Sequence, residues 1–241
     1  MRVDWASHKA TSFACQNWHY SKTVPIPPLV KIGVWEEDKF VGVVVFSRGA
    51  SSNLLKPYGL KQTEGCELSR VALRKHKTPV SKIVKIALRF LKQHDPTVRL
   101  VVSFADPHRG HHGGIYQAGN WVYAGATAPG KEYLHRGKKL HSRQVSEKGW
   151  KIQHGVKWKT AKPSECEVVE TPGKHRYLMP LDKEIAERIA PLAKPYPKRG
   201  KQAMAPPRAQ RQGSADLHAP ALEESGENFP SNKADEDKAV V

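Results

Sequence analysis

Two side chains that can handle protons stand next to each other in the segment QNWHYSKTV, namely His19 and Tyr20. An imidazole exchanges protons near neutral pH, and a phenol can donate one to a leaving group in suitable surroundings. A helix that only packs against a core needs neither group. One interpretation is that both residues lie at the mouth of a catalytic cleft. The alternative is that Trp18 and Tyr20 belong to the core and His19 lies on the surface.

A carboxylate ends the buried-type strand RLVVSFADP, at Asp106. Pro107 follows it and cannot donate to a strand ladder, so the strand stops there. Ligands of open α/β sheets bind beyond the carboxyl ends of strands, so we predict that Asp106 belongs to the functional site. The alternative is an aspartate that only caps the loop.

Three histidines follow Asp106, at His108, His111 and His112. Their spacing is neither a HExxH nor a zinc-finger pattern. We expect solvated loop histidines or phosphate contacts here rather than a metal cluster.

Tyr116 lies in the short segment GIYQAG, shortly after Asp106. A phenol at this place could act as a general acid toward a leaving thiolate. Taken alone, an amphipathic core tyrosine is the simpler reading. Arg70 interrupts an apolar strand and needs an anionic partner if it is buried, and either Glu67 or a ligand could supply one.

The order of hydrophobic patterns predicts a mixed α/β fold. The 3.6-residue period of VSKIVKIALRFLKQH predicts a long helix over 80–94, with Thr78 as its N-cap and Pro79 at its first position. Other patterns predict a helix at 8–20, a hairpin at 31–49, strands at 65–75, 99–107 and 121–129, and a short helix at 113–120. Lysine and histidine residues at 75–77 precede the long helix, whose free N–H groups favour an anion such as a pyrophosphate. A solvated loop is the alternative.

The overall charge indicates an anionic partner. Lysine and arginine number 40 against 23 acidic residues, which gives a formal charge of +17. Three widely spaced cysteines exclude a disulfide framework and fit a reducing cytosol. The N-terminus lacks a signal-peptide core, and the apolar runs are too short to cross a bilayer. We expect a soluble protein of the cytoplasm, without membrane contact.

The composition divides the chain into a folded domain at 1–188 and a tail at 189–241. The tail is first rich in proline and basic residues and then acidic, so it cannot bury enough apolar area to offset its ordering entropy. We predict that the tail is disordered.

The order strand, loop, long helix, strand, short helix with tyrosine, strand resembles the core of GNAT N-acyltransferases. LRKHKTPVSK stands where that fold binds acyl-CoA pyrophosphate, and GIYQAGNWVYAG is similar to the end of the core. HYSK, ELSRVAL, SFADP and GGIYQAGNW together resemble the Mom family of phage DNA-modification proteins, over roughly residues 10 to 180. The resemblance implies a GNAT-like, mostly antiparallel central sheet flanked by helices.

The resemblance to the Mom family also implies a function. In that family a small carbamoyl-type group is added to adenine N6 in DNA, which shields phage DNA from restriction in the bacterial host. The implied catalytic residues are His19, Tyr20, Asp106, Tyr116 and Ser103. An acyl-CoA donor such as acetyl-CoA would contact Arg70, Lys75, Lys77, Ser81 and Lys82. The family is linked to iron, for which His19 and Asp106 would be the ligands. One departure is that KHKTPVSK lacks the glycines of the usual pyrophosphate loop.

Double-stranded DNA is the partner that these inferences favour. The expected phosphate contacts are Arg109, Lys131, Arg136, Lys138, Lys139 and Arg143. Adenine N6 lies in the base-pairing face, so the base must be flipped out, and Trp18, Tyr20 or Trp121 could stack on it. The oligomeric state stays open, a homodimer included.

Three alternatives remain. The first is a metal-dependent nuclease built on Asp106 and the three histidines, which lacks a second clear carboxylate. The second is a basic DNA-binding protein without catalysis. The third is a GNAT acyltransferase that acts on another amine.

Overall fold

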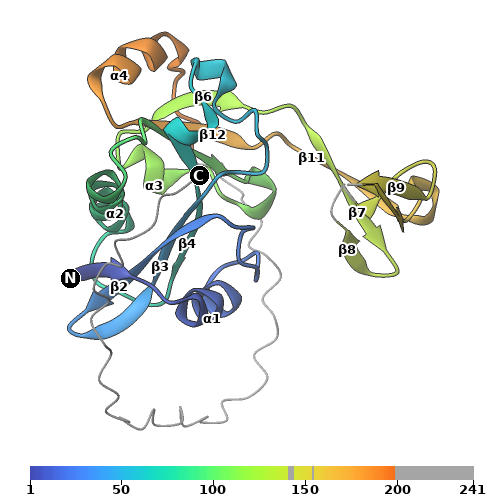
Figure 1. Cartoon of the computed structure of the whole chain (residues 1–241), viewed down its shortest axis with the longest axis horizontal. Helices are drawn as coiled ribbons and strands as arrows, with labels where there is room; N and C mark the ends of the chain where they lie inside the picture. The colour runs from blue at the N-terminus through green and yellow to red at the C-terminus, as the bar shows by residue number, and fades with distance from the viewer. Residues whose placement is uncertain (141–143, 154, 199–241) are drawn as a thin grey trace, which may run out of the picture. The chain divides into compact units, whose positions relative to one another are not determined.

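A seven-stranded mixed sheet forms the centre of the protein, with the strand order β1-β2-β3-β4-β5-β12-β6 (Figure 1). The computed structural model describes residues 1–140, 144–153 and 155–198. Neighbouring strands are antiparallel except for β4 and β5, which run parallel. The strands are β1 Arg2–Trp5, β2 Leu29–Glu36, β3 Lys39–Ser47, β4 Gly65–Leu73, β5 Leu100–Ala105, β6 Val122–Ala126 and β12 His175–Pro180. The predicted mixed, mostly antiparallel sheet is confirmed.

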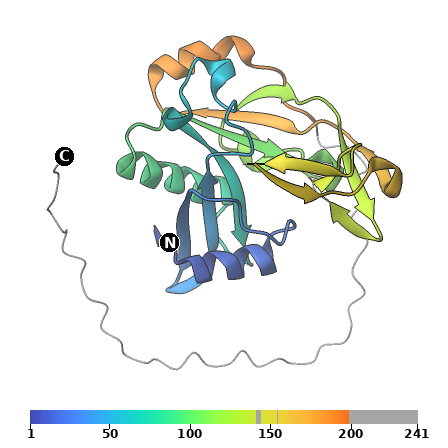
Figure 2. The same cartoon turned by 45° about the vertical axis from the view of Figure 1, so that its right-hand side comes forward.

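Helices cover both faces of this sheet (Figures 1 and 2). Because side chains alternate along a strand, β3 presents Val44 and Phe46 to one face and Val43 and Val45 to the other. The first pair packs in the core cluster of α2, and the second pair packs with α1. The helices are α1 His8–Trp18, α2 Val80–His94, α3 Gly114–Gln117 and α4 Lys183–Ile189. The short 3-10 turns are η1 Lys56–Tyr58, η2 Gln62–Glu64, η3 Pro107–Arg109, η5 Pro163–Glu165 and η6 Ala190–Leu192.

The long helix α2 has the bounds that its hydrophobic period predicts, but its start differs from the prediction. Pro79 takes the N-cap position and no side chain caps the helix, so the predicted N-cap at Thr78 is wrong. The N–H of Thr78 instead donates to the Glu36 carboxylate at 2.7 Å. A residue distant in sequence therefore satisfies the loop ahead of this helix.

An insertion between β6 and β12 forms two further small sheets (Figure 1). One contains β7 Gly130–His135, β8 Lys138–Leu140 and β11 Glu167–Thr171; the other contains β9 Trp150–Gln153 and β10 Val156–Lys159. The sequence predicted none of these strands. The insertion closes at a neck, where Thr127 N donates to Lys174 O and Lys174 N donates to Thr127 Oγ1, both at 2.9 Å. A side chain at Gly173 would overlap the backbone of Thr127, so the neck requires glycine there.

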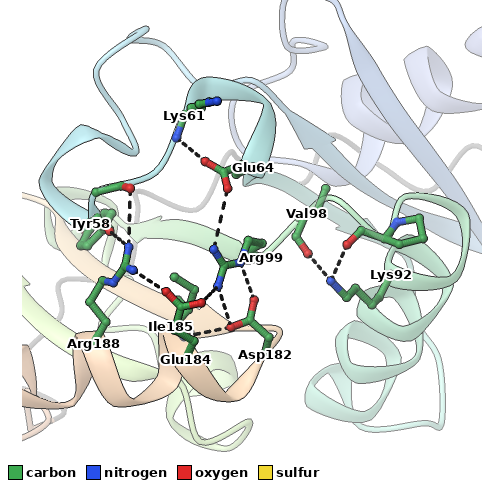
Figure 3. Close-up of polar contacts among 12 residues, drawn as sticks. Tyr58, Lys61, Glu64, Lys92, Val98, Arg99, Asp182, Glu184, Ile185 and Arg188 are labelled. Carbon is green, nitrogen blue, oxygen red and sulfur yellow. Dashed lines mark hydrogen bonds and ion pairs between the residues drawn. The ribbon is translucent and has the colours of Figure 1, made fainter.

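Arg99 ties the start of β5 to α4 (Figure 3). Its guanidinium donates to Asp182 at 2.8 Å and to Glu184 at 2.6 Å, and it lies 3.8 Å from Glu64. Asp182 also caps α4 by accepting from Ile185 N at 2.9 Å. The network fixes the end of the sheet where β4 and β5 are paired.

The described chain continues past residue 188, the predicted end of the domain. Tyr196 donates its phenol proton to the carbonyl oxygen of Trp121 at 2.8 Å, and Lys194 N donates to Tyr123 O at 2.8 Å. The segment at 199–241, most of the predicted disordered tail, lies outside the described residues. Among the described residues, no helix has the length and apolar character that a bilayer crossing requires.

Candidate active site

A cleft opens where β4 and β5 part. The two strands are paired at only three positions, Gly65–Leu100, Cys66–Val101 and Glu67–Val102. Beyond Glu67 the rest of β4 has no partner on β5, and a cavity of about 910 Å³ lies between the strand ends. Its walls come from the end of α1, from β4, from the loop after β5 and from α3.

Five of the predicted site residues line this one cavity: His19, Tyr20, Arg70, Asp106 and Tyr116. They come from four separate segments of the chain. Ser103 is fully buried behind the wall and contacts two residues that line the cavity, Tyr116 and Leu68. The cleft therefore gathers an imidazole, two phenols, a carboxylate and a guanidinium.

The hydrogen bonds of His19 determine which tautomer it adopts. The backbone N–H of Ser21 donates to Nδ1 at 3.1 Å, and Ser21 Oγ lies 2.8 Å from the same nitrogen. A backbone N–H can only donate, so Nδ1 accepts and the neutral ring carries its proton on Nε2. Burial, then the charges of Arg70, His111 and Lys22, lowers the pKa of His19 to about 4. The ring is thus neutral at physiological pH and offers an N–H donor.

Aromatic rings line the mouth of the cleft. Tyr20 is 52 % exposed, with its ring centroid 4.4 Å from that of His19 and 5.1 Å from that of His111. Such a row of π faces can stack on a planar base. Trp121, in contrast, is 1 % exposed and packs in the core beside Tyr116, so its predicted stacking role is wrong.

Tyr116 and Ser103 form the buried floor. Ser103 Oγ lies 2.7 Å from the Tyr116 phenol oxygen and 2.8 Å from the Leu68 carbonyl oxygen. Burial raises the pKa of Tyr116 to about 12, so the phenol keeps its proton at neutral pH. Gly113, the N-cap residue of α3, has a φ of +86° and lies where a Cβ would overlap the Tyr177 ring, so only glycine permits this approach of α3 to β12.

Asp106 both lines the cavity and caps the loop. Its Oδ1 accepts from His108 N at 3.0 Å, and Lys174 Nζ lies 3.9 Å from Oδ2. Asp106 can therefore belong to the functional site and cap the loop at the same time. Lys174, at the neck of the insertion, also lines the cavity, and no pattern in the sequence pointed to it.

The cavity contains a second carboxyl group, that of Glu67. Burial raises its pKa. The sequence pointed to Glu67 only as a partner for Arg70, but Arg70 donates instead to Thr23 O at 3.1 Å and to Ser69 O at 2.7 Å. An ionisable residue within the apolar strand was the signal that could have identified Glu67 as a site residue.

The loop ahead of α2 does not present the anion site expected from the sequence. The N–H groups of Lys77 and Thr78 both donate to the Glu36 carboxylate, at 2.8 and 2.7 Å, and the Lys77 ammonium pairs with Glu37 at 2.6 Å. These amide bonds lower the pKa of Glu36 to about 2. The other expected cofactor contacts, Lys75, Lys77, Ser81 and Lys82, are outside the cavity lining, although His76 and Val80 belong to it.

Of the predicted DNA contacts, Arg109 and Lys139 both pair with Glu132 on β7. Lys131, Arg136 and Lys138 are exposed on or next to β7 and β8. Arg143 lies outside the described residues.

A metal finds few ligands in this cleft. Across the described ranges, no three His, Cys, Asp or Glu side chains converge on one point. The tautomer of His19 also places the proton on Nε2, the ring nitrogen that would have to bind a metal while Nδ1 accepts from Ser21. The residues therefore do not fit an iron ion held by His19 and Asp106.

Known proteins resemble this chain in sequence and in structure. The methylcarbamoylase mom of Escherichia phage Mu is 26 % identical over 205 residues, covering 82 % of this chain and 84 % of that protein. The Bacillus subtilis acetyltransferase solved with CoA covers 64 % of this chain and 78 % of its own, with 14 % identity and a TM-score of 0.35. The aminoglycoside 6'-N-acetyltransferase of Enterococcus faecium covers 76 % and 98 %, with 8 % identity and a TM-score of 0.40.

A family model also matches the chain. The model of the Mom protein family matches residues 1–198 of the 241. The chain belongs to the Mom protein family.

Proposed function

We propose that this protein transfers a small acyl or carbamoyl-type group to the exocyclic N6 of adenine in double-stranded DNA. Its membership of the Mom family and its similarity to the phage Mu methylcarbamoylase support a DNA-modifying transferase. The charge of +17 supports a polyanionic substrate. The proposed setting is the cytoplasm of a bacterial host, where the modification protects phage DNA from restriction.

The observation that carries the proposal is the convergence of His19, Tyr20, Asp106 and Tyr116 on one cavity at the open ends of β4 and β5. A base within a duplex cannot enter such a cavity, so the adenine is flipped out. Tyr20 and His111 lie at the mouth, where their rings can stack on the flipped base.

The proposed reaction forms a bond between adenine N6 and the carbonyl carbon of the donor, and it breaks the bond from that carbon to the leaving group. Asp106 accepts the proton that N6 loses. His19 donates a hydrogen bond from Nε2–H to the carbonyl oxygen while negative charge develops there. Tyr116 gives its phenol proton to the leaving group and regains one from solvent. Since its pKa is about 12, this transfer accompanies bond breaking rather than preceding it.

Acyl-CoA, for example acetyl-CoA, is the donor that the resemblance implies, and when bound it supplies an activated carbonyl group. Glu36 already occupies the amides of Lys77 and Thr78. The loop therefore does not fit a pyrophosphate held by these two amides. The proton-transfer and hydrogen-bonding roles proposed for Asp106, His19 and Tyr116 do not depend on that loop.

Mass spectrometry of nucleosides tests the proposal. DNA from cells that express the full chain should contain a heavier deoxyadenosine, and its mass gives the added group. The Asp106→Ala variant should lack it while keeping its circular dichroism spectrum. Unmodified DNA in the presence of abundant, folded wild-type protein would overturn the proposal and favour DNA binding without catalysis or an acceptor other than DNA.

A further inference from the structure

The hairpin of β9 and β10 has one face that combines basic and apolar side chains. The register pairs Trp150 with Lys159 and Ile152 with Lys157. Directly opposed residues of an antiparallel pair lie on the same face. Trp150, Ile152, Lys157 and Lys159 therefore form one continuous surface, called here the hairpin face.

The charge of this hairpin has one sign. Residues 148–162 contain five lysines and no acidic residue. The ammonium of Lys157 lies 4.4 Å from the centre of the Trp150 ring, and that of Lys148 lies 5.5 Å from it. A cation over an indole is held by the negative face of the ring. Trp150 thus positions two ammonium groups that can bind neighbouring anions.

An apolar side chain of the hairpin face is exposed to solvent next to these lysines. Ile152 is 61 % exposed. Exposed apolar side chains beside a set of positive charges suit a ligand that has both anionic groups and apolar surface. A nucleic acid has both, in its phosphates and in its sugars and bases.

We propose that the hairpin face, together with Lys148 beside Trp150, binds duplex DNA outside the cleft, with Lys148 and Lys157 on phosphates and Ile152 against the groove. This inference rests on the proposed function, because it assigns the hairpin to the same substrate. The contact is independent of sequence and adds affinity without reading bases.

The position of the hairpin in the chain favours DNA over an anionic membrane. Its strands belong to the insertion that begins with β7, and β7 is joined to the loop after β5 by the Arg109–Glu132 ion pair of 3.3 Å. Asp106 begins that loop and lines the cavity. A polymer whose base enters the cavity therefore passes next to the sheet that carries β7, whereas a membrane has no reason to bind at the cavity.

Fluorescence anisotropy with a labelled duplex, measured over a range of NaCl concentrations, tests the inference. The full-length Lys148→Gln/Lys157→Gln variant should bind roughly threefold to tenfold more weakly, and the slope of log K against log salt should fall by about two, one for each phosphate contact. The matched control is Lys56→Gln/Lys183→Gln. It removes two exposed lysines outside the insertion, Lys56 on η1 and Lys183 on α4, and should keep the wild-type slope.

Ile152→Ser tests the apolar part of the same contact. It should weaken binding while leaving the salt slope unchanged, because it removes no charge. A wild-type slope and affinity in both hairpin variants would overturn the inference. If the hairpin variants lose binding to phosphatidylserine vesicles but bind DNA as the wild-type protein does, the inference is also overturned and the face is assigned to a membrane surface.

Nucleoside mass spectrometry on the same proteins separates this inference from the proposed function. In one outcome the wild-type protein binds DNA and the Lys148→Gln/Lys157→Gln variant shows the expected change of slope, but no modified deoxyadenosine forms. This outcome would reject the transferase proposal and support the hairpin contact. If instead the DNA is modified and the hairpin variants bind it as the wild-type protein does, the transferase is supported and the contact is rejected.

Discussion

The hydroxyl of Ser103 lies 2.7 Å from the phenol oxygen of Tyr116, below the cavity floor. Ser103 has one proton and two acceptors within reach, since the Leu68 carbonyl oxygen is 2.8 Å away. When Ser103 donates to Leu68, the phenol donates to Ser103. When Ser103 donates to the phenol, the phenol proton is free to point into the cleft. Ser103 thus controls the direction of the one proton that Tyr116 can transfer.

We expect Tyr116→Phe to lower DNA modification by roughly 100-fold, the usual size of a lost general acid. Its stability should change by only about 1 kcal/mol, because one buried hydrogen bond is lost. Nucleoside mass spectrometry and thermal melting measure the two effects. Ser103→Ala should retain more activity than Tyr116→Phe, since the phenol stays in place. Full modification by Tyr116→Phe would remove the phenol from the mechanism.

His19 should titrate near pH 4 rather than near its usual value of 6.5. Because the unfolded chain binds this proton more readily than the folded one, the stabilising effect of neutral His19 is present above pH 6.5 and is lost as pH falls toward 4. NMR of the imidazole protons measures the midpoint. Arg70→Gln should raise it, because the guanidinium contributes to the shift, although burial contributes more. A midpoint above 6 in the wild-type protein would contradict the buried, neutral imidazole.

Glu36→Gln should raise the affinity for CoA about tenfold, on the order of 1.4 kcal/mol. The amide can still accept one hydrogen bond but no longer repels a pyrophosphate from the N–H groups of Lys77 and Thr78. Isothermal titration calorimetry compares the variant with Glu37→Gln, whose carboxylate touches the Lys77 ammonium on an exposed surface. Equal CoA affinity in all three proteins would show that a pyrophosphate does not approach these amides.

Arg99→Ala should lower the free energy of unfolding by more than the loss of one exposed ion pair does, since it removes charged hydrogen bonds to Asp182 and Glu184. The side chain of Arg99 is 25 % exposed. Arg2→Ala is the control, because its pair with Asp4 is exposed and contributes about 0.5 kcal/mol at most. Urea denaturation followed by circular dichroism measures both. Equal losses in the two variants would mean that the network around Arg99 does not hold α4 to the sheet.

The sequence predicted the elements that have a strong internal period. The helix α2 has the predicted bounds, and the residues that set its period, Ile83, Val84, Ala87, Leu88 and Leu91, are all buried in the core. The strands β7, β8 and β11 were not predicted because they are three to six residues long and partly exposed, and no alternation of apolar and polar residues marks them. The strands β9 and β10, WKIQ and VKWK, do alternate, so their pattern was present in the sequence and was missed. The helix α4 is only seven residues long, and the charged side chains of its KEIAERI segment obscure the two buried isoleucines.

For the site, the sequence indicated which residues meet but not what they do there. His19, Tyr20, Asp106 and Tyr116 drew attention by residue type, but the resemblance to the Mom family decided their choice as site residues, and all four line one cavity. The tautomer of His19 depends on the backbone of Ser21. The occupation of the α2 loop by Glu36 depends on a contact across 41 residues. Neither arrangement leaves a local pattern that could be read before the chain is folded.

The neck at Thr127 and Lys174 makes the insertion a separable cassette. Because the chain enters and leaves it at residues that hydrogen-bond each other, a short turn from Thr127 to Lys174 could replace the whole segment without rerouting β6 or β12. Under the proposed function, a different module grafted at this neck would bring another polymer to the same cavity.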